Sequence, residues 1–211
     1  MVSKTILLET LQSGLQELKI DLAMNIQEKL IAYIELLAKW NGVHNLTAIR
    51  DPVKMVQWHL VDSLALLPHL PSGRIIDVGT GAGLPGIPLA LCRGEEVVLL
   101  DSLQKKMTFV EHVILSLKVT NAAAVCSRVE KYQPKALFEL VISRAFASLA
   151  DFIHSAQHLC KPSGRLVAMK GTLESEELAA VPEGFSIEKM ISVSVPGIDR
   201  SRHLVFIKRG A

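Results

Sequence analysis

Cysteine, aromatic residues and net charge are all scarce in this chain of 211 residues. Three cysteines (Cys92, Cys126 and Cys160) cannot all pair and none lies in a CxxC motif, which excludes a disulfide framework or a cysteine-built zinc site. Lysine plus arginine exceed aspartate plus glutamate by only 23 to 21, which excludes a strongly basic architectural nucleic-acid binder but not a local basic patch. No apolar run approaches the roughly 18 residues that span a bilayer, and the first residues do not resemble a secretory signal. We therefore expect a cytoplasmic protein that makes no membrane contacts.

Apolar residues, by contrast, are abundant. They make up 49% of the chain and charged residues 21%, so we expect a folded protein with a sizeable core. The turn-forming stretch PHLPSG at 68–73 divides the sequence into two parts. Before it, apolar residues recur at spacings of three and four and predict helices within 6–18, 26–40 and 52–67. We therefore assign 1–70 to an N-terminal helical extension and 71–211 to a second part.

The second part alternates short apolar runs with amphipathic segments. The runs predict strands at 74–78, 97–101, 122–126, 138–143 and 164–170, with helices at about 84–93, 103–117 and 149–160 between them. This alternation is typical of parallel strands joined by right-handed crossovers, and hence of a doubly wound α/β sheet. Segments 185–195 and 202–209 are too close together for a crossover helix, so we expect a terminal antiparallel hairpin. The prediction is a Rossmann-like sheet of seven strands.

The strongest local motif is DVGTGAGLPGIPLA at 77–90, which follows the first predicted strand. Glycines permit positive φ angles and let the backbone approach a ligand beside the start of a helix. In a doubly wound sheet this loop lies at the carboxyl ends of the strands, where ligands bind. We therefore expect a cofactor at this loop rather than a plain turn.

The identity of that cofactor is open from the loop alone. Gly81, Gly83 and Gly86 satisfy GxGxxG, and Asp101 ends the second predicted strand, as in dinucleotide-binding proteins. Asp77, placed where a carboxylate could face an ammonium group, favours S-adenosylmethionine, as does the lack of room for a separate substrate domain. An acid at position 101 could bind the ribose of either nucleoside. The expected terminal antiparallel hairpin favours a methyltransferase.

Eight segments, taken together and in order, resemble the glucose-inhibited division protein B family of 16S rRNA guanine-N7 methyltransferases. The resemblance covers nearly the whole chain. The segments are WNGVHNLTAI (40–49), HLVDSLAL (59–66), DVGTGAGLPGIPLA (77–90), LLDSLQKKMTFV (99–110), SRVE (127–130), VISRAFASL (141–149), MKG (169–171) and RHLVFIK (202–208).

This resemblance implies a class I S-adenosylmethionine-dependent methyltransferase fold and a target at guanine 527 in the decoding-region loop of 16S rRNA. Position by position, it places the cofactor contacts at Gly79, Leu84, Val129, Glu130 and Arg144. Gly81 in the same loop and Asp101 at the ribose complete the expected cofactor set on general grounds of this fold.

Basic residues near the expected carboxyl ends of the strands form a candidate RNA-binding rim. Its members are Lys105, Lys106, Arg144, Lys170, Arg200, Arg202 and His203. Such a rim would contact phosphates despite the small net charge. The expected partner is 16S rRNA or the 30S ribosomal subunit, and we expect a monomer.

Catalytic and metal-binding constellations are hard to find. The histidines form no metal-ligand pattern, and no Ser–His–Asp arrangement can be argued. Asn45 and Thr47 suit either a helix cap or a substrate-facing loop, whereas His59 and Asp62, three residues apart, are more typical of packed or solvated positions. We therefore predict neither a metal nor a catalytic side chain, only positioning of the reactants.

That prediction agrees with the chemistry of guanine N7, which carries an in-plane lone pair and no proton, so that no general base is needed. Two other classes remain open from the sequence: an NAD-dependent oxidoreductase, and a non-enzymatic ribosome-assembly factor that retains a nucleotide crevice. A methyltransferase acting on a small molecule would not need the basic rim.

Overall fold

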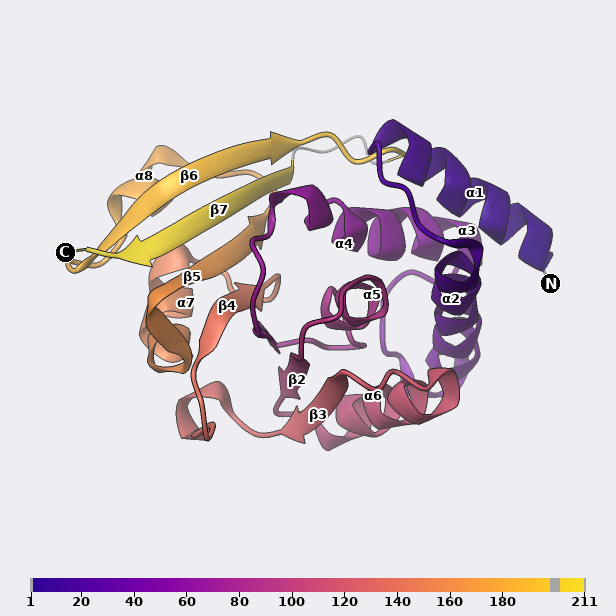
Figure 1. The fold of residues 1–211 in the computed structure, drawn as a ribbon, viewed down its shortest axis with the longest axis horizontal. Helices are drawn as coiled ribbons and strands as arrows, with labels where there is room; N and C mark the ends of the chain where they lie inside the picture. The colour runs from indigo at the N-terminus through magenta and orange to yellow at the C-terminus, as the bar shows by residue number, and fades with distance from the viewer. Residues whose placement is uncertain (1, 198–201, 211) are drawn as a thin grey trace.

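A mixed sheet of seven strands forms the centre of the computed structural model, which describes residues 2–197 and 202–210 (Figure 1). The strands run in the order β3-β2-β1-β4-β5-β7-β6. The first five are parallel, whereas β7 is antiparallel to both β5 and β6, so the predicted doubly wound sheet with a terminal hairpin is confirmed. The strands are β1 (Ile75–Val78), β2 (Val97–Asp101), β3 (Ala122–Cys126), β4 (Phe138–Ser143), β5 (Cys160–Lys170), β6 (Phe185–Val193) and β7 (Arg202–Arg209).

Helices cover both faces of this sheet. Helices α5 (Gly86–Cys92) and α6 (Gln104–Leu117) pack on one face, and α7 (Leu149–Ala156), with the short α8 (Ser175–Ala179) beside it, covers the other. Successive strand residues point to opposite faces, so Ile75 joins the first core and Ile76 the second. Because β1 is buried on both faces, it is a continuous apolar run interrupted only by Asp77.

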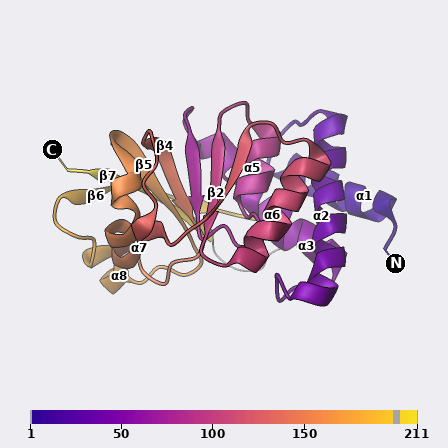
Figure 2. The same cartoon turned by 90° about the horizontal axis from the view of Figure 1, so that it is seen from below.

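The N-terminal helices form a further layer outside α5 and α6. Helix α2 (Met24–His44) packs along α6, with the ring of Trp40 5.5 Å from that of Phe109, and α1 (Lys4–Glu17) packs farther out (Figure 2). Apolar residues of α1 and α2 belong to the same buried cluster as those of α6 and β2. The extension therefore shares one hydrophobic core with the sheet.

The third N-terminal helix is more irregular than its apolar spacing predicts. It begins at α3 (Pro52–Met55), capped by the Asp51 side chain, widens into a π-helical turn, η1 (Val56–Val61), and ends with α4 (Asp62–Leu64). A π turn shifts the side chains that follow it, and such turns occur frequently at functional sites. Two polar residues of this segment, His59 and Asp62, are buried.

Two further differences from the sequence-based expectation are an earlier start of strand β5 and the presence of short 3-10 turns. Helix α7 ends at Ala156 and a 3-10 turn, η4 (Gln157–Leu159), follows, so that β5 begins at Cys160 rather than at 164. Another 3-10 turn, η3 (Val129–Lys131), lies between β3 and β4, and η2 (Leu67–His69) precedes β1. Short 3-10 turns have no apolar period that a sequence could reveal.

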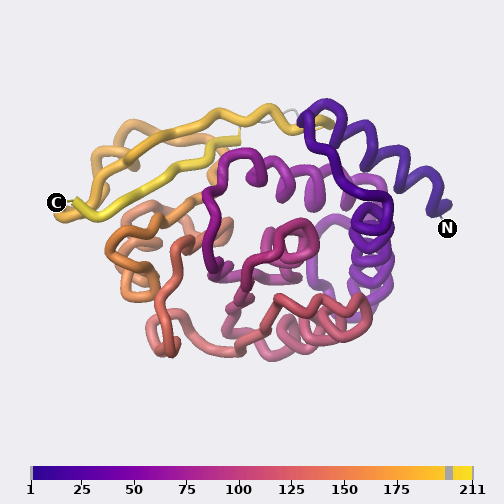
Figure 3. The backbone as a smooth tube through the Cα atoms, viewed as in Figure 1, coloured from indigo at the N-terminus to yellow at the C-terminus, as the bar shows by residue number. Residues whose placement is uncertain are grey.

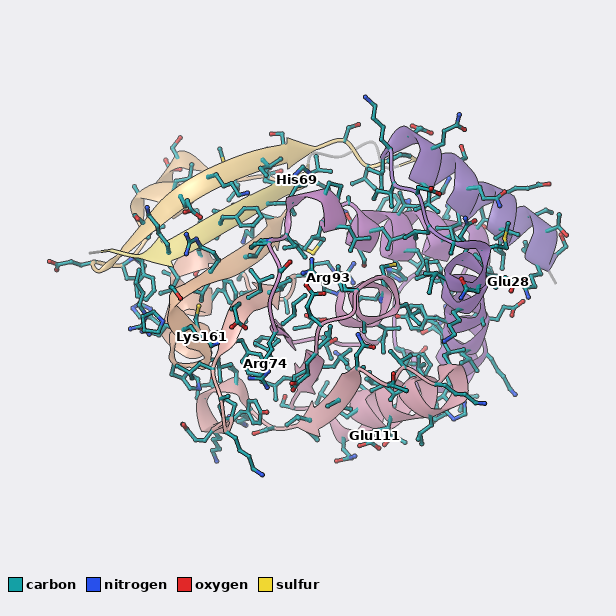
Figure 4. All side chains as sticks on the ribbon, in the orientation of Figure 1. Glu28, His69, Arg74, Arg93, Glu111 and Lys161 are labelled. Carbon is teal, nitrogen blue, oxygen red and sulfur yellow. The ribbon has the colours of Figure 1, made fainter. Side chains whose placement is uncertain are left out.

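Ion pairs lie at the amino ends of the strands. There, Arg74 and Lys161 (labelled in Figure 4) pair with Glu96 and Glu139.

Helix α1 and the end of β7 lie at opposite sides of the molecule (Figure 3). Within the described part of the chain, no helix combines the length and the apolar character needed to cross a membrane.

Candidate cofactor and substrate site

The glycine loop is folded around the buried carboxylate of Asp77. Gly79, Gly81 and Gly83 have φ angles of 71°, 61° and 91°, which only glycine adopts readily. Asp77 Oδ2 accepts hydrogen bonds from Thr80 Oγ1 (2.6 Å) and from the Gly86 amide (2.8 Å), which ties β1 to the start of α5. Burial raises the pKa of Asp77 to about 6. Oδ2 of Asp77 thus holds the loop together, whereas its other oxygen, Oδ1, is buried without a hydrogen-bond partner among the described residues.

Asp101 at the end of β2 connects the glycine loop to the next helix. Its Oδ2 accepts a hydrogen bond from the Gly81 amide (3.0 Å), and its Oδ1 accepts one from the Leu103 amide (3.0 Å). Lys106 Nζ lies 3.8 Å from Oδ2. The carboxylate also lines a cavity, so it both fixes the loop and faces a prospective ligand.

A first cavity of about 350 Å³ opens at the carboxyl ends of β1, β2 and β4. It contains four of the seven predicted cofactor residues: Gly79, Asp101, Val129 and Glu130. Ser102 and Phe146 add a hydroxyl and an aromatic wall. A half-polar cleft at the point where the strand order reverses is the place where doubly wound folds bind nucleosides.

A second cavity of about 250 Å³ adjoins the first at Gly79 and Ala145. It contains the other predicted cofactor residues, Gly81, Leu84 and Arg144. A Cβ atom at Gly79 would lie 2.7 Å from Ala145 Cβ, whereas one at Gly81 would meet nothing closer than 3.9 Å and would project into open space. The cofactor set predicted from the sequence thus lines two connected cavities.

Tyr33 of α2 is a supporting residue that the sequence reasoning missed. Its side chain is fully buried, and its hydroxyl donates a 2.9 Å hydrogen bond to the Ala82 carbonyl in the glycine loop. Burial raises its pKa far above the ordinary value, so the hydroxyl stays protonated and remains a donor. Helix α2 therefore supports the loop from behind. In the sequence, a polar-tipped aromatic on an apolar helical stripe was the only available sign.

We expect Tyr33→Phe to lower the free energy of unfolding by about 1–2 kcal/mol, because the buried Ala82 carbonyl loses its donor. Affinity for S-adenosylmethionine should fall several-fold, since the loop loses a support. Chemical denaturation and calorimetry measure the two effects. The other tyrosine provides the control: Tyr132 makes no hydroxyl hydrogen bond to the described residues, so Tyr132→Phe should change neither quantity appreciably. Unchanged cofactor affinity in Tyr33→Phe would contradict a supporting role.

A polar cluster from the NLTAI segment and the π turn forms one wall of the second cavity. The Asn41 side chain bonds the Thr47 amide and the Ile49 carbonyl and so shapes the segment, while Asn45, at φ 50°, ends α2. Thr47 Oγ1 lies 2.9 Å from His59 Nε2 and accepts from the Ile49 amide. The Trp58 carbonyl, 3.2 Å from His59 Nδ1, can only accept, which assigns neutral His59 a proton on Nδ1, so that Nε2 accepts from the Thr47 hydroxyl.

His59 should make folding sensitive to mild acid. Burial and the positive charge of Arg144 lower its pKa to about 4, against roughly 6.5 in an unfolded chain. The unfolded state thus binds the proton more tightly, so the stability contributed by neutral His59 is complete above about pH 6.5 and is lost as the pH falls towards 4.

Between pH 7 and pH 5, we expect the free energy of unfolding of the wild type to fall by about 2 kcal/mol more than that of His59→Gln, whose glutamine cannot titrate. Urea unfolding at each pH measures it. Parallel curves for the two proteins would show that His59 keeps an ordinary pKa.

A third cavity of about 300 Å³ lies next to the second, with His59 and Arg144 in both walls. At its edge, the buried Asp62 carboxylate pairs with two arginines, through Oδ2 to Arg144 Nη1 (3.3 Å) and through Oδ1 to Arg202 Nε (2.8 Å). Met169 and Trp58 supply apolar walls. Residues from the π turn, the start of α4, the end of β5 and the start of β7 converge here with Arg144, which directly follows β4.

The candidate RNA-binding residues are not equally free to meet phosphates. Lys170 is largely buried and pairs with Glu177 (2.8 Å), and Arg202 is engaged with Asp62. His203 is on β7, with Nδ1 3.1 Å from Ser192 Oγ, whereas Lys105 is exposed at the start of α6. Arg200 lies outside the described residues. The predicted rim is thus divided between paired and solvent-facing cations.

The fold and the site together define a class I methyltransferase: a parallel sheet with an antiparallel seventh strand, and a two-part cavity at a glycine loop followed by an acid-ended strand. The model of the family rRNA small subunit methyltransferase G (GidB) matches residues 26–205, and the chain belongs to this family. Within residues 2–197 and 202–210, no group of three or more His, Cys, Asp or Glu side chains could hold a metal ion.

Similar proteins match this chain over almost its full length. A ribosomal RNA small subunit methyltransferase G from Methylobacillus flagellatus is 49% identical over 200 residues, which span 94% of this chain and 97% of the relative. One from Chromobacterium violaceum is 47% identical, over 92% and 94% of the two chains. A S-adenosylmethionine-dependent methyltransferase from Thiobacillus denitrificans, solved with S-adenosyl-L-homocysteine, has the same fold, with a TM-score of 0.53 at 11% identity over 83% of this chain and 97% of that one.

Proposed function

We propose that this protein transfers the methyl group of S-adenosylmethionine to N7 of guanine 527 in 16S rRNA. The observation that carries the proposal is a family match over residues 26–205 in a chain whose predicted cofactor residues line two connected cavities. Relatives that match nearly end to end are named as small-subunit ribosomal RNA methyltransferases. The substrate is ribosomal RNA, and the small ribosomal subunit is the form in which we expect it to be presented.

The two cavities fit the two halves of the cofactor. In the first, the Asp101 carboxylate suits a ribose diol, and the backbone of Val129 and Glu130 suits an adenine edge. In the second, Gly81 leaves space beside the loop, and Arg144 offers a positive charge to a carboxylate. These assignments rest on the chemistry of the lining groups and on the family pattern.

The reaction needs positioning rather than proton transfer. When bound, S-adenosylmethionine supplies an electrophilic methyl group: the N7 lone pair forms the new N–C bond, and the electrons of the broken C–S bond stay on sulfur. N7 has no proton to lose, so the protein has to hold the acceptor in line with the methyl group. His59, which lines the second cavity, fits a reaction without proton transfer, because its low pKa keeps it neutral at physiological pH and both its ring nitrogens lie within hydrogen-bond distance of protein groups, Nε2 of Thr47 and Nδ1 of the Trp58 carbonyl.

The RNA side of the site combines exposed and paired cations. We place Lys105, Lys106, Arg202 and His203 towards the RNA, with Lys170 held against Glu177 at the edge of the site. Guanine N7 lies in the deep groove of an RNA helix, where side chains cannot reach it, so the target must be in a loop or an opened region. We further propose that the protein acts as a monomer in the cytoplasm.

The direct test is methyl transfer to small subunits from a strain that lacks this activity. Tritiated S-adenosylmethionine is supplied with the protein, and the labelled nucleotide is mapped by nuclease digestion and mass spectrometry. We expect one 7-methylguanosine per subunit, at guanine 527. Subunit binding without label would favour an assembly factor, and label on another atom or molecule would contradict the proposed acceptor.

A further inference from the structure

The segment 144–148, which joins β4 to α7, forms a wall of both cofactor cavities. Ala145 and Phe146 line the first cavity, and Arg144 and Ala145 line the second. A Cβ atom added at Gly79 would lie only 2.7 Å from Ala145 Cβ, so the segment packs directly against the glycine loop. A displacement of this segment would therefore change the shape of the space in which we place the cofactor.

Lys170, the last residue of β5, holds this segment through two of its backbone carbonyls. Its Nζ donates to the Ala147 carbonyl (2.5 Å) and to the Phe146 carbonyl (3.4 Å). The third contact is the ion pair with Glu177 (2.8 Å), and the Lys170 side chain is only 12% exposed. An ammonium group has three N–H donors, so these three contacts engage all of them. The amine then has no donor left over for an RNA phosphate.

Glu177, on the short helix α8, fixes the same segment from its far end. Its Oε1 accepts a hydrogen bond from the Leu149 amide (3.0 Å) and also forms the ion pair with Lys170. Leu149 is the first residue of α7, and the first amides of a helix have no partner within it, so the carboxylate adds to the cap that Ser148 provides. One carboxylate oxygen thus joins the start of α7 to the amine that holds the segment before it.

The pair between Lys170 and Glu177 differs from an ordinary surface ion pair, which contributes little because water screens it. The two side chains are only 12% and 17% exposed. The amine also donates to two carbonyls, and hydrogen bonds from a charged donor are roughly twice as strong as neutral ones. Removal of either charge should consequently loosen the segment as well as break the pair.

From this arrangement we propose that Lys170 and Glu177 are positioning residues for the cofactor, which hold the segment 144–148 in the shape that binding of S-adenosylmethionine requires. Lys170 acts through the two carbonyls, and Glu177 acts by fixing the Lys170 amine and the start of α7. Neither side chain binds an RNA phosphate. The inference rests on the proposed function, in particular on the placement of the cofactor, and it separates Lys170 from the cations that face the RNA.

The test uses two variants of the full chain: Lys170→Met, which removes the donors from a side chain of similar length, and Glu177→Gln, which removes the charge and keeps an oxygen acceptor. Titration calorimetry measures binding of S-adenosylmethionine. Filter binding at several KCl concentrations measures binding of small subunits that lack the modification. We expect the Kd for S-adenosylmethionine to rise about 10-fold in Lys170→Met and at least about 3-fold in Glu177→Gln. Subunit affinity and its salt dependence should stay at the wild-type values.

The two variants would change subunit binding in opposite directions if Lys170 contacted a phosphate instead. Lys170→Met would then weaken subunit binding and reduce the slope of log K against log salt concentration by about 0.7–0.9. Glu177→Gln would strengthen subunit binding, because it removes a negative charge and releases the amine. Either change, together with normal cofactor affinity, would overturn the inference.

Strand β5 provides a matched control at its opposite end. Lys161 Nζ pairs with Glu139 Oε1, and Glu139 Oε2 accepts from the Arg74 amide (2.9 Å), so this glutamate also joins a lysine of β5 to a backbone amide. Lys161→Met and Glu139→Gln make the same chemical changes and should leave the Kd for S-adenosylmethionine within about 2-fold of the wild type. Equal losses of cofactor affinity in the control pair and in the Lys170 and Glu177 variants would overturn the inference, since general destabilisation would explain them.

Two features keep the test decisive. Glu177→Gln retains an acceptor for the Leu149 amide, so unchanged cofactor affinity in this variant overturns the inference even if Lys170→Met does not fold. The proposed function fails by a different result, because it is contradicted when the wild type itself does not bind S-adenosylmethionine or does not methylate the subunit.

Discussion

Replacing Gly81 with valine is expected to weaken S-adenosylmethionine binding by at least about 100-fold, or roughly 2.7 kcal/mol. Gly81 has a φ of 61°, and a Cβ atom there would project into the second cavity with no protein atom closer than 3.9 Å. The added isopropyl group thus occupies space next to the loop backbone, where the cofactor must lie. The expected effect of the substitution is on cofactor binding, because the added Cβ atom does not clash with other protein atoms. Titration calorimetry measures the loss.

The fold supplies a closely matched control for this substitution. Gly184 also has a positive φ, 82°, and also has open space around a prospective Cβ, but it precedes β6, far from the glycine loop. At either position, the left-handed backbone conformation of valine should lower the free energy of unfolding by about 1–2 kcal/mol. Gly184→Val should therefore be destabilised to a similar extent and still bind cofactor normally. If both variants lose affinity equally, backbone strain rather than occupied space is the cause, and the site assignment is wrong.

Replacing the target guanine with 7-deazaguanine is expected to abolish methyl transfer. This base has a C–H group in place of N7 and keeps its Watson–Crick edge and O6. The nucleophilic lone pair is lost, so transfer should fall below detection, whereas the size and the Watson–Crick edge of the base are retained. Subunits carrying the altered base should consequently compete with unmodified subunits for the protein. Incorporation of tritium and competition assays measure the two properties separately.

A second altered subunit, with 7-deazaguanine at a neighbouring guanine, serves as the control and should be methylated at the normal rate. Methylation of the subunit that lacks the target N7 would show that another atom accepts the methyl group. The protein would then need a general base to remove a proton, and the positioning mechanism would be wrong.

Local patterns in the sequence were sufficient for the framework of this protein. The alternation of apolar runs and amphipathic helices gives the doubly wound sheet, because a strand buried on both faces and a helix buried on one have different apolar periods. The short connection before 202–209 gives the antiparallel hairpin. The glycines at 79, 81 and 83 and the acid at the end of β2 mark the candidate cofactor cleft, since their requirements are set within a few residues.

Contacts between distant parts of the chain were decided only by the tertiary structure. Tyr33 supports a carbonyl 49 residues away, and Asp62 joins arginines 82 and 140 residues away, so neither partnership leaves a periodic trace. His59 in the π turn and Asp62 directly after it are both buried, although their spacing also suited a solvent-facing helix surface. Likewise, the hydrogen bonds by which Asp77 Oδ2 holds Thr80 and Gly86 became evident only in the folded chain. Sequence determines which segments are strands and helices through local periodicity, whereas the pairing of buried polar groups depends on how those segments pack.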